Sequence, residues 1–389
     1  MIYLDNCATT TCDPEVVIAI SDCLTETLGN PSSSNVAGKR ALRLIQRARL
    51  QIANLIDANP DELIFTSGAT ESNNLALLGS IGQHEQSPTN VVISPIDHAS
   101  TTQVAAALEH RGLQVKRLQV DSHGIVTEEE VERCINHDTR LLSLAMVNSE
   151  IGTIQQVNAI GALCRSKGVL FHVDASQAIG RVAVSVSDIS ADLLSLSGHK
   201  IYGPPGIGVL YVRQDVRERL HLLTFGGGQQ QLRSGTLPTA LIVGLGLACQ
   251  LAATRRDTDT ALAITLRDNF LRQLQAVVPD IELNSSLVHC VPHILNFRAA
   301  GLNAETLVVR LHDVAISAGS ACSSKSAKPS AVLTGIGLSA EQVAGSVRVC
   351  FSRHLNNLDV QMAASKIGSA ILAIRGDWSA EQANSGVQH

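Results

Sequence analysis

The chain has 389 residues, of which 45% are hydrophobic and 17% charged, with a formal net charge of −5. The ordinary apolar fraction and the low, mixed charge exclude a disordered chain, and the length is typical of two or three structural units. The mildly negative charge disfavours nucleic acid or an anionic membrane as the main partner, so we expect no direct nucleic-acid binding.

The sequence carries no sign of export, of a membrane span or of a metal site. Its N-terminus lacks the basic flank and apolar core of a signal peptide. The most apolar helical stretch, residues 240–253, is shorter than the ~20 residues that a span needs. The nine cysteines are odd in number and contain no C-x-x-C pair. We therefore expect a reduced, cytoplasmic chain whose cysteines are mostly buried small hydrophobic side chains.

Two helices are the first predicted elements of any length. Asp13 suits an N-cap and Pro14 suits the first helical position, which together predict a helix over residues 14–28. Apolar residues at helical spacing predict a second helix over residues 38–56.

Short apolar runs of the kind that form buried parallel strands come next. The predicted strands are residues 62–66, 90–94, 141–147, 169–173 and 193–197. Helical patterns over residues 72–80, 101–110 and 160–167 separate several of these strands. Such alternation predicts an α/β domain with a mostly parallel sheet.

The pattern changes after residue 253. A polar segment, residues 255–260, interrupts the apolar helical pattern, and a further helix is expected to run to about residue 278. Short strands near residues 293–297 and 346–352 then flank helices, which suits a smaller α+β domain. We predict a large domain over residues 15–255 and a small domain built from residues 1–14 and 256–389.

Lys200 ends the motif SGHK at residues 197–200, directly after an apolar strand. Ligands in open α/β sheets usually bind where strands leave the sheet. A partly desolvated lysine amine at such a place forms a Schiff base with a carbonyl cofactor. Taken alone, Lys200 would more often be an exposed loop lysine.

Asp174 lies at the end of the predicted strand before that of Lys200. A carboxylate there is placed to face the ring nitrogen of pyridoxal phosphate (PLP), which must stay protonated for the ring to act as an electron sink. An isolated aspartate would more commonly cap a turn. The pairing of strand–Asp with strand–SGHK is much rarer than either piece alone.

Small polar residues at two places suit an anion. The motif TSGATES at residues 66–72 follows a strand and opens a helix, so its backbone N–H groups can meet a phosphate at the positive helix end. An ordinary helix cap at Thr70 explains it nearly as well. A second Gly-rich stretch contains GGG at residues 226–228 and RSGT at residues 233–236.

Cys322 differs in context from the other cysteines. It lies in the small-residue run SAGSACSSKS at residues 317–326, with no bulky neighbours to bury it. A mobile loop suits a nucleophile that must visit more than one position. Cys164 and Cys249, in contrast, lie in apolar or helical contexts that are typical of inert core thiols.

Together these motifs resemble the PLP-dependent cysteine desulfurases of the NifS/IscS type, within the class-V aminotransferase-like family. The resemblance extends from YLDNCATT at residues 3–10 to SVR at residues 346–348. Its most specific stretches are FTSGATES (65–72), HVDASQ (172–177), SLSGHKIYGP (195–204), RSGTLP (233–238) and GSAC (319–322). It implies the fold of type I PLP-dependent transferases, with a large domain and a smaller α+β domain.

The resemblance also implies how PLP is bound. The residues it assigns to the cofactor are Lys200, Asp174, Gln177, Ala69, Thr70, Ser197, His199, Thr236 and Ser149. Lys200 is the residue bonded to PLP, Asp174 pairs with the ring nitrogen and Gln177 meets the ring hydroxyl. Thr236 is expected to reach the phosphate of the partner subunit in a homodimer.

For the reaction, the resemblance implies that His98 stacks on the ring and transfers a proton. Arg348, with Asn30 nearby, grips the carboxylate of L-cysteine. Cys322 takes the sulfur as a persulfide, leaving L-alanine, and passes it to an acceptor protein. Iron–sulfur cluster assembly, tRNA thiolation and DNA sulfur modification all use such a donor, and the sequence leaves the acceptor open.

Three departures from the family pattern point to a specialised paralogue. Ser149 stands where the family usually has an Asn that bonds the cofactor hydroxyl, and Asn35 replaces a usual His. The loop from Gly226 is shorter than usual and lacks an acidic residue. The alternatives are a related class-V aminotransferase, a selenocysteine lyase, or a catalytically silent dimeric scaffold. The presence of Lys200 and Cys322 disfavours the scaffold.

Overall fold

The computed structural model describes residues 1–27, 29–81, 89–229, 232–319 and 329–385, and Cys322 lies outside them. Within these ranges the helices are α1 (Pro14–Glu26), α2 (Val36–Ile56), α3 (Ala69–Ile81), α4 (Ala99–His110), α5 (Glu128–Cys134), α6 (Val157–Lys167), α7 (Val186–Ile189), α8 (Thr239–Val277), α9 (Ala304–Arg310), α10 (Ala331–Gly335), α11 (Ala340–Ala344) and α12 (Asn357–Ser385). The strands are β1 (Ile2–Tyr3), β2 (Leu63–Thr66), β3 (Asn90–Ile93), β4 (Gln114–Arg117), β5 (Thr139–Ala145), β6 (Leu170–Asp174), β7 (Leu193–Ser197), β8 (Gly208–Val212), β9 (Glu282–Leu283), β10 (Ile294–Arg298), β11 (Val314–Ala315) and β12 (Ser346–Cys350).

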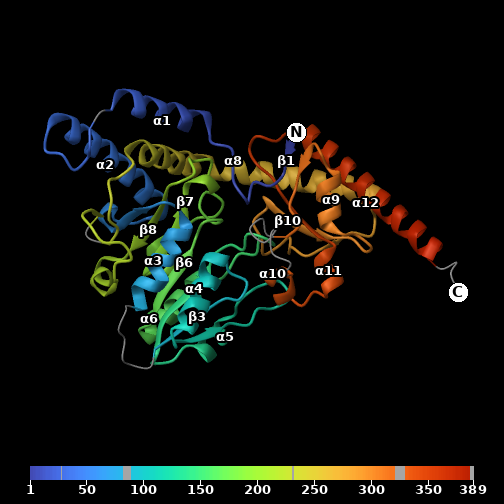
Figure 1. The fold of residues 1–389 in the computed structure, drawn as a ribbon, viewed down its shortest axis with the longest axis horizontal. Helices are drawn as coiled ribbons and strands as arrows, with labels where there is room; N and C mark the ends of the chain where they lie inside the picture. The colour runs from blue at the N-terminus through green and yellow to red at the C-terminus, as the bar shows by residue number, and fades with distance from the viewer. Residues whose placement is uncertain (28, 82–88, 230–231, 320–328, 386–389) are drawn as a thin grey trace.

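A seven-stranded sheet organises the larger part of the molecule (Figure 1). Its strand order is β2-β8-β7-β6-β5-β3-β4. The strands from β7 to β4 run parallel, while β8 runs antiparallel to both of its neighbours. The α/β class with a mostly parallel sheet is confirmed. The central strands β6, β7 and β8 are buried along their whole length, which explains why they read as continuous apolar runs.

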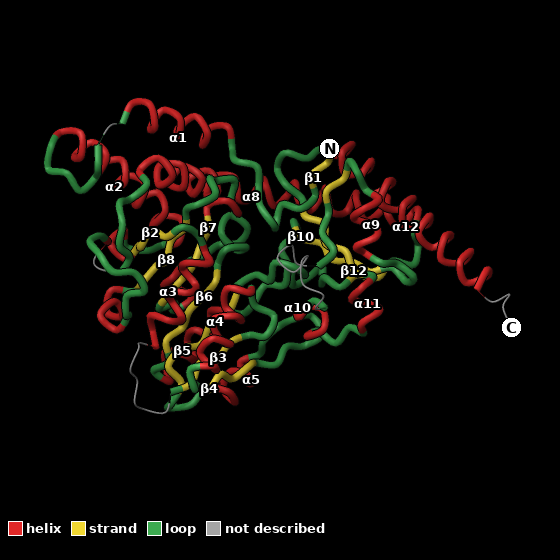
Figure 2. Tube along the Cα trace, viewed as in Figure 1, coloured by secondary structure: helices red, strands yellow, loops and turns green. Residues whose placement is uncertain are grey.

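A second, smaller sheet has the strand order β12-β10-β9. Helices α9, α11 and α12 lie around it (Figure 2). Its core is a separate buried cluster in which Phe270 contacts Phe297 and Phe351. The N-terminal strand β1 pairs with β11 on this side of the molecule, so the first residues return to the C-terminal half. The first half of α8 packs into the main apolar cluster of the large sheet, and its second half packs into the cluster of the smaller sheet.

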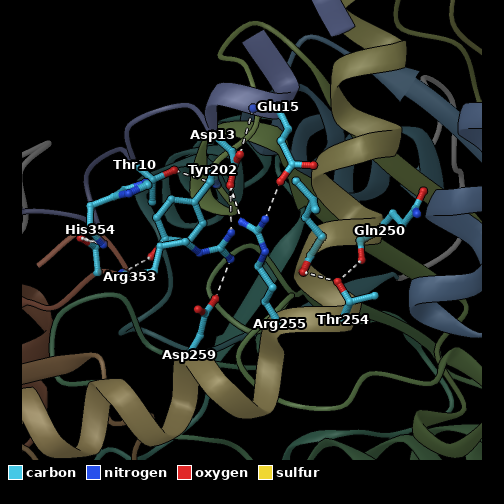
Figure 3. Close-up of polar contacts among 12 residues, drawn as sticks. Thr10, Asp13, Glu15, Tyr202, Gln250, Thr254, Arg255, Asp259, Arg353 and His354 are labelled. Atoms are coloured by element: carbon cyan, nitrogen blue, oxygen red, sulfur yellow. Dashed lines mark hydrogen bonds and ion pairs between the residues drawn. The ribbon is translucent and has the colours of Figure 1, made fainter. Parts of the chain in front are cut away.

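Helix α8 corrects the expected break at residues 255–260, because it runs without interruption from Thr239 to Val277. The segment contains neither Gly nor Pro, and its charged side chains have partners. Arg255 forms ion pairs with Asp13 and Glu15, and Asp259 pairs with Arg353 (Figure 3). The polar residues therefore tie the helix to its neighbours. The predicted domain boundary after residue 255 lies inside this helix and stays a prediction.

Candidate active site

A cavity of about 420 Å³ opens where the parallel strands of the large sheet end. The ends of β5, β6 and β7 contribute Ala145, Asp174 and Ser197 to its wall. The start of α3 and the residue before α4 contribute Thr70 and His98. The carboxyl edge of an open α/β sheet is the usual place for a ligand, and here five separate elements meet.

The amine of Lys200 is held at the wall of this cavity. Its Nζ donates hydrogen bonds to the backbone carbonyl oxygens of Cys7 (2.5 Å) and Ala8 (2.8 Å). Lys200 ends a short 3₁₀ turn, Gly198–Lys200, that continues directly from β7. The chain therefore places a nucleophilic amine beside the end of β6, where Asp174 lies.

Asp174 is a buried carboxylate that the protein surrounds with neutral donors. Its Oδ1 accepts from the backbone N–H and the hydroxyl of Ser176, at 2.9 and 2.5 Å. Its Oδ2 accepts from Asn73 Nδ2 at 2.8 Å. No salt bridge joins it to a cation within the residues that the structure describes. A buried carboxylate that faces a cavity without a cation suits a positively charged ligand group such as a pyridinium.

Asn73, on α3, was not among the residues that the sequence singled out. It donates to Ser100 Oγ at 2.8 Å as well as to Asp174, and Ser100 Oγ lies 2.8 Å from His98 Nδ1. A buried chain of hydrogen bonds thus links Asp174 to His98. Only the helical spacing of α3, which turns Asn73 inward, could have pointed to it.

His98 caps α4, and its hydrogen bonds define the state of its ring. The backbone N–H of Ser100 donates to Nδ1 at 3.1 Å, so Nδ1 is an acceptor. The neutral ring therefore carries its proton on Nε2. Because His98 lines the cavity, this arrangement suits a group that exchanges a proton with a ligand.

The start of α3 and the SGHK turn form a site for an anion. Ser67, Gly68, Ala69, Thr70, Ser197 and His199 all line the cavity. Burial, together with the charge of Lys200, lowers the pKa of His199 to about 4, so its ring is neutral. A Cβ on Gly208 would lie 2.7 Å from the Cα of Gly68, so only glycine allows β8 to approach this turn closely.

Arg348, on β12, brings a fully buried cation to the cavity. Its Nη1 donates to the carbonyl oxygen of Ser149 at 2.9 Å, and its Nη2 pairs with Asp5 Oδ1 at 2.7 Å. Nη2 also lies 3.2 Å from Ser317 Oγ, while Nε has no partner in the described part of the chain. Such a guanidinium suits the recognition of a carboxylate.

Gln177 and Ser149 complete the predicted residues that line this cavity. Gln177 Nε2 donates to the carbonyl of Cys7 at 3.0 Å, which fixes the amide at the wall. Ser149 lines the cavity and presents its carbonyl to Arg348. Asn35, the other departure from the family pattern, caps α2 by accepting from the backbone N–H of Gly38 at 2.9 Å.

Two of the predicted residues, Asn30 and Thr236, do not line the cavity. Asn30 is exposed, and its Oδ1 accepts from the backbone N–H of Ser32. Thr236 is exposed on the Gly-rich loop before α8. Cys322 lies outside the described residues. The roles assigned to these three residues stay predictions.

Two buried titratable groups stand behind the site. His172, next to Asp174 on β6, lies between Ser143 Oγ (2.8 Å) and Ser195 Oγ (2.9 Å), and burial lowers its pKa to about 4. Asp97, next to His98, accepts from the backbone N–H of Ala145, and burial raises its pKa to about 8. The sequence indicated neither role.

The residues present fit PLP. The cavity combines a lysine amine, a buried carboxylate without a cation and a neutral set of anion donors at a helix start. These are the three chemical partners that an aldehyde, a pyridinium nitrogen and a phosphate require. No cluster of His, Cys, Asp and Glu suited to a metal ion occurs in the described ranges, and no described helix is long and apolar enough to cross a membrane.

Comparisons with known proteins agree with this geometry. The model of the family described as Aminotransferase class-V matches residues 2–362. The cysteine desulfurase IscS of Neisseria gonorrhoeae is 41% identical over 376 residues, 96% of this chain and 93% of that protein. A solved NifS-like protein has a TM-score of 0.88 at 29% identity, covering 95% of this chain and 98% of its own. SspA in complex with cysteine has a TM-score of 0.81 at 32% identity, covering 90% and 99%.

Proposed function

Because the chain belongs to the class-V aminotransferase family, we propose that it is a PLP-dependent cysteine desulfurase, which converts L-cysteine to L-alanine. The observation that carries this proposal is the meeting of Lys200, Asp174 and Arg348 in one cavity. The similarity to a cysteine desulfurase over 96% of the chain, and to a structure solved with cysteine bound, supports it.

In this proposal each part of PLP has a protein partner. Lys200 holds the aldehyde carbon, and Asp174 keeps the ring nitrogen protonated. The start of α3, with Thr70, Ser197 and His199, holds the phosphate. When bound, PLP supplies an electron sink next to the Cα of the substrate. His98, with its proton on Nε2, moves a proton at the substrate.

Arg348 orients the substrate by its carboxylate. The guanidinium is fixed by Asp5 and by the carbonyl of Ser149, and its unpartnered Nε leaves donor capacity for an anion. Because the guanidinium is buried and preorganised, a bound carboxylate gains a charge-assisted hydrogen bond without reordering the side chain. The amino acid is thereby placed with its side chain free to meet a nucleophile.

Cys322 is the proposed sulfur acceptor. Its thiolate attacks the substrate sulfur, so that a C–S bond of L-cysteine breaks while an S–S bond forms on Cys322. The products are L-alanine and a Cys322 persulfide, which then passes its outer sulfur to an acceptor protein. In this proposal the enzyme is a homodimer whose subunits share their sites through Thr236.

The activity is tested by incubating the purified holoenzyme with L-cysteine and dithiothreitol and measuring alanine and sulfide together. We expect equal amounts of both products. Lys200→Ala should lose the absorbance of bound PLP and both products, whereas Cys322→Ser should keep PLP and lose nearly all turnover. Cys12→Ser is the matched control and should act as wild type.

Other outcomes would contradict the proposal. A keto acid without sulfide would indicate an aminotransferase, and no product from a PLP-loaded protein would indicate a scaffold. Alanine formation that is much faster from selenocysteine than from cysteine would indicate a selenocysteine lyase. A persulfide found by mass spectrometry on a cysteine other than Cys322 would displace that residue from its role.

A further inference from the structure

Two cysteines far apart in the sequence, Cys7 and Cys350, lie on segments that are bonded to each other, and Cys7 lines the cavity. Cys7 lies in the turn after β1, and Cys350 ends β12. Backbone contacts hold the two segments together, because Cys350 N–H donates to the carbonyl of Leu4 at 2.7 Å. Asn6 Nδ2 donates to the carbonyl of Cys350 at 3.0 Å. The pairing of the two chain ends therefore brings these two side chains together.

Cys7 and Cys350 are both buried free cysteines, and each side chain influences the pKa of the other, as expected for neighbouring thiols. The imidazole of His293 is only 3% exposed, its Nδ1 has no hydrogen-bond partner in the described part of the chain, and its proximity lowers the pKa of the Cys7 thiol. Cys7 lines the active-site cavity, so a small molecule that enters the cavity reaches this thiol.

The charges around the pair make its two thiols unequal. Burial raises the pKa of Cys7, but the neighbouring side chains of Cys350 and His293 and the nearby charge of Arg348 outweigh this effect, so the pKa lies well below its ordinary value. Burial and the neighbouring Cys7 raise the pKa of Cys350. Cys7, whose pKa is lowered, is therefore the better nucleophile of the two, and Cys350, whose pKa is raised, suits the resolving partner.

We propose that Cys7 and Cys350 form a redox-active dithiol in the wall of the active-site cavity, which hydrogen peroxide closes to a disulfide. The Cys7 thiolate attacks one oxygen of the peroxide, forms a sulfenic acid and releases hydroxide. The Cys350 thiol then attacks the Cys7 sulfur, forms the S–S bond, and releases water. In total, one thiolate and one thiol lose two electrons to one peroxide, which is reduced to one hydroxide and one water.

This modification acts directly on the catalytic groups. The carbonyl of Cys7 accepts hydrogen bonds from Lys200 and Gln177, and Cys350 lies two residues beyond Arg348 on the same strand. A disulfide between them shifts the backbone that positions the lysine amine. Oxidation is therefore expected to lower activity, and a dithiol reductant is expected to restore it.

The test treats the PLP-loaded Cys322→Ser enzyme with a small excess of hydrogen peroxide, so that Cys322 cannot supply a competing partner. Digestion with trypsin after thiol alkylation leaves Cys350 as the only cysteine in residues 349–353, whereas residues 1–39 contain Cys7, Cys12 and Cys23. We expect a mass loss of about 2 Da from two thiols and a cross-link between these peptides, with fragment ions that place it at Cys7.

Two variants sharpen the result. Cys350→Ser should lose the cross-link, and its Cys7 should be oxidised beyond the sulfenic acid. Cys12→Ser, five residues from Cys7 in the same peptide, should form the cross-link as before. Cys7 should react at least about tenfold faster than half-buried Cys12 at neutral pH, because more of it is thiolate.

Three results would overturn the proposal. The first is a cross-link from Cys7 to Cys12 or Cys23 in place of Cys350. The second is complete oxidation of Cys12 while Cys7 and Cys350 stay reduced. The third is a cross-link that forms while the absorbance of bound PLP and the activity of the enzyme with intact Cys322 stay unchanged. Since the wild-type and Cys322→Ser digests alone decide the first two, a Cys350→Ser variant that fails to fold does not weaken the test.

Discussion

Among single residues, Asn73 has the most informative position, because it joins the buried carboxylate to the proton-carrying histidine. It donates to both Asp174 and Ser100, yet it is not part of the cavity lining. It therefore acts on the reaction through these neighbours and has no contact with a ligand in the cavity. A residue of this kind is a positioning residue.

We expect Asn73→Ala to keep PLP and to lower kcat by about ten- to a hundredfold, since a hydrogen bond to a charged group contributes about 1.5–3 kcal/mol. The KM for L-cysteine should change little, because the binding groups are untouched. Asn74→Ala, at the neighbouring half-buried position of the same helix, is the matched control. Steady-state kinetics with L-cysteine measure both constants. A change confined to KM would refute the role of Asn73 as a positioning residue.

Asp97 predicts a pH-dependent stability. Burial, with repulsion from Asp174, raises its pKa to about 8, so the folded chain keeps a proton that the unfolded chain releases above about pH 4. Stability therefore falls as the pH rises from about 4 to 8. Asp97→Asn does not titrate, so its gain in stability over wild type should grow with pH, approaching about 1.4 kcal/mol per unit.

Denaturant unfolding of both proteins at several values between pH 5 and 8 measures this difference. Asp257→Asn, at an exposed position, serves as the control and should give a constant difference. A constant difference for Asp97→Asn as well would show that the carboxyl stays ionised in the folded protein.

The sequence pointed to Lys200 and Asp174 through motifs at strand ends and to His98 through the family resemblance, and the structure places all three around one cavity. It did not identify Asn73, Asp97 or the pairing of Cys7 with Cys350. Their roles depend on contacts between segments that are distant in the sequence, and local sequence patterns do not predict such contacts. Thr236 and Asn30 illustrate the same limit, since their own chain does not bring them to the cavity.

At the scale of elements, the ion pairs along α8 explain why one helix replaces the two that were expected. Arg353 pairs with Asp259 at 2.6 Å and with Asp13 at 3.2 Å, and its guanidinium lies 3.9 Å from the ring centre of Tyr202 (Figure 3). Helical periodicity alone treats residues 255–260 as a polar interruption. Periodicity cannot show that the charged side chains of this segment form ion pairs with residues of other elements.

The ion pairs of Arg353 predict that a single substitution at Asp259 strongly lowers the stability of the fold. Asp259→Asn removes one partner of a mostly buried pair and should lower the free energy of unfolding by roughly 3 kcal/mol. Asp257→Asn, whose side chain is 88% exposed and pairs with Arg256, should cost less than about 1 kcal/mol. Equal effects in urea unfolding would show that the Asp259–Arg353 pair does not fasten α8.

Strand β8 was also missed, although it is short, apolar and fully buried. It follows the glycine- and proline-containing turn after Lys200. Strand β8 runs antiparallel to its neighbours β2 and β7, unlike the parallel pairs in the rest of the sheet. Fold class was therefore predictable from periodicity, whereas the order of strands needed the packing of β2 against β8.

At the scale of the whole molecule, exposed apolar side chains support the proposed dimer. Val17, Ile18 and Leu24 lie on α1 with 50–68% of their surface exposed, and Phe225, 78% exposed, precedes the loop that carries Thr236. Contiguous apolar groups on a surface commonly mark an interface. A two-fold axis through such an interface would place each Thr236 loop against the neighbouring site.

Shared sites predict that two defective variants rescue each other. Suppose that Thr236 contacts the phosphate bound by the partner chain. A hybrid of one Lys200→Ala chain and one Thr236→Ala chain then contains one intact site. That site has the Lys200 of the Thr236→Ala chain and the Thr236 of the Lys200→Ala chain. Co-expressed hybrids, separated by two affinity tags, should therefore recover close to half of the wild-type activity, while each parent homodimer stays well below it. If Thr236 instead serves its own chain, every site in the hybrid carries one of the two lesions and no rescue occurs. Sedimentation of the hybrid confirms its two-chain mass, and a fully active monomer in the same experiment would remove the premise of shared sites altogether.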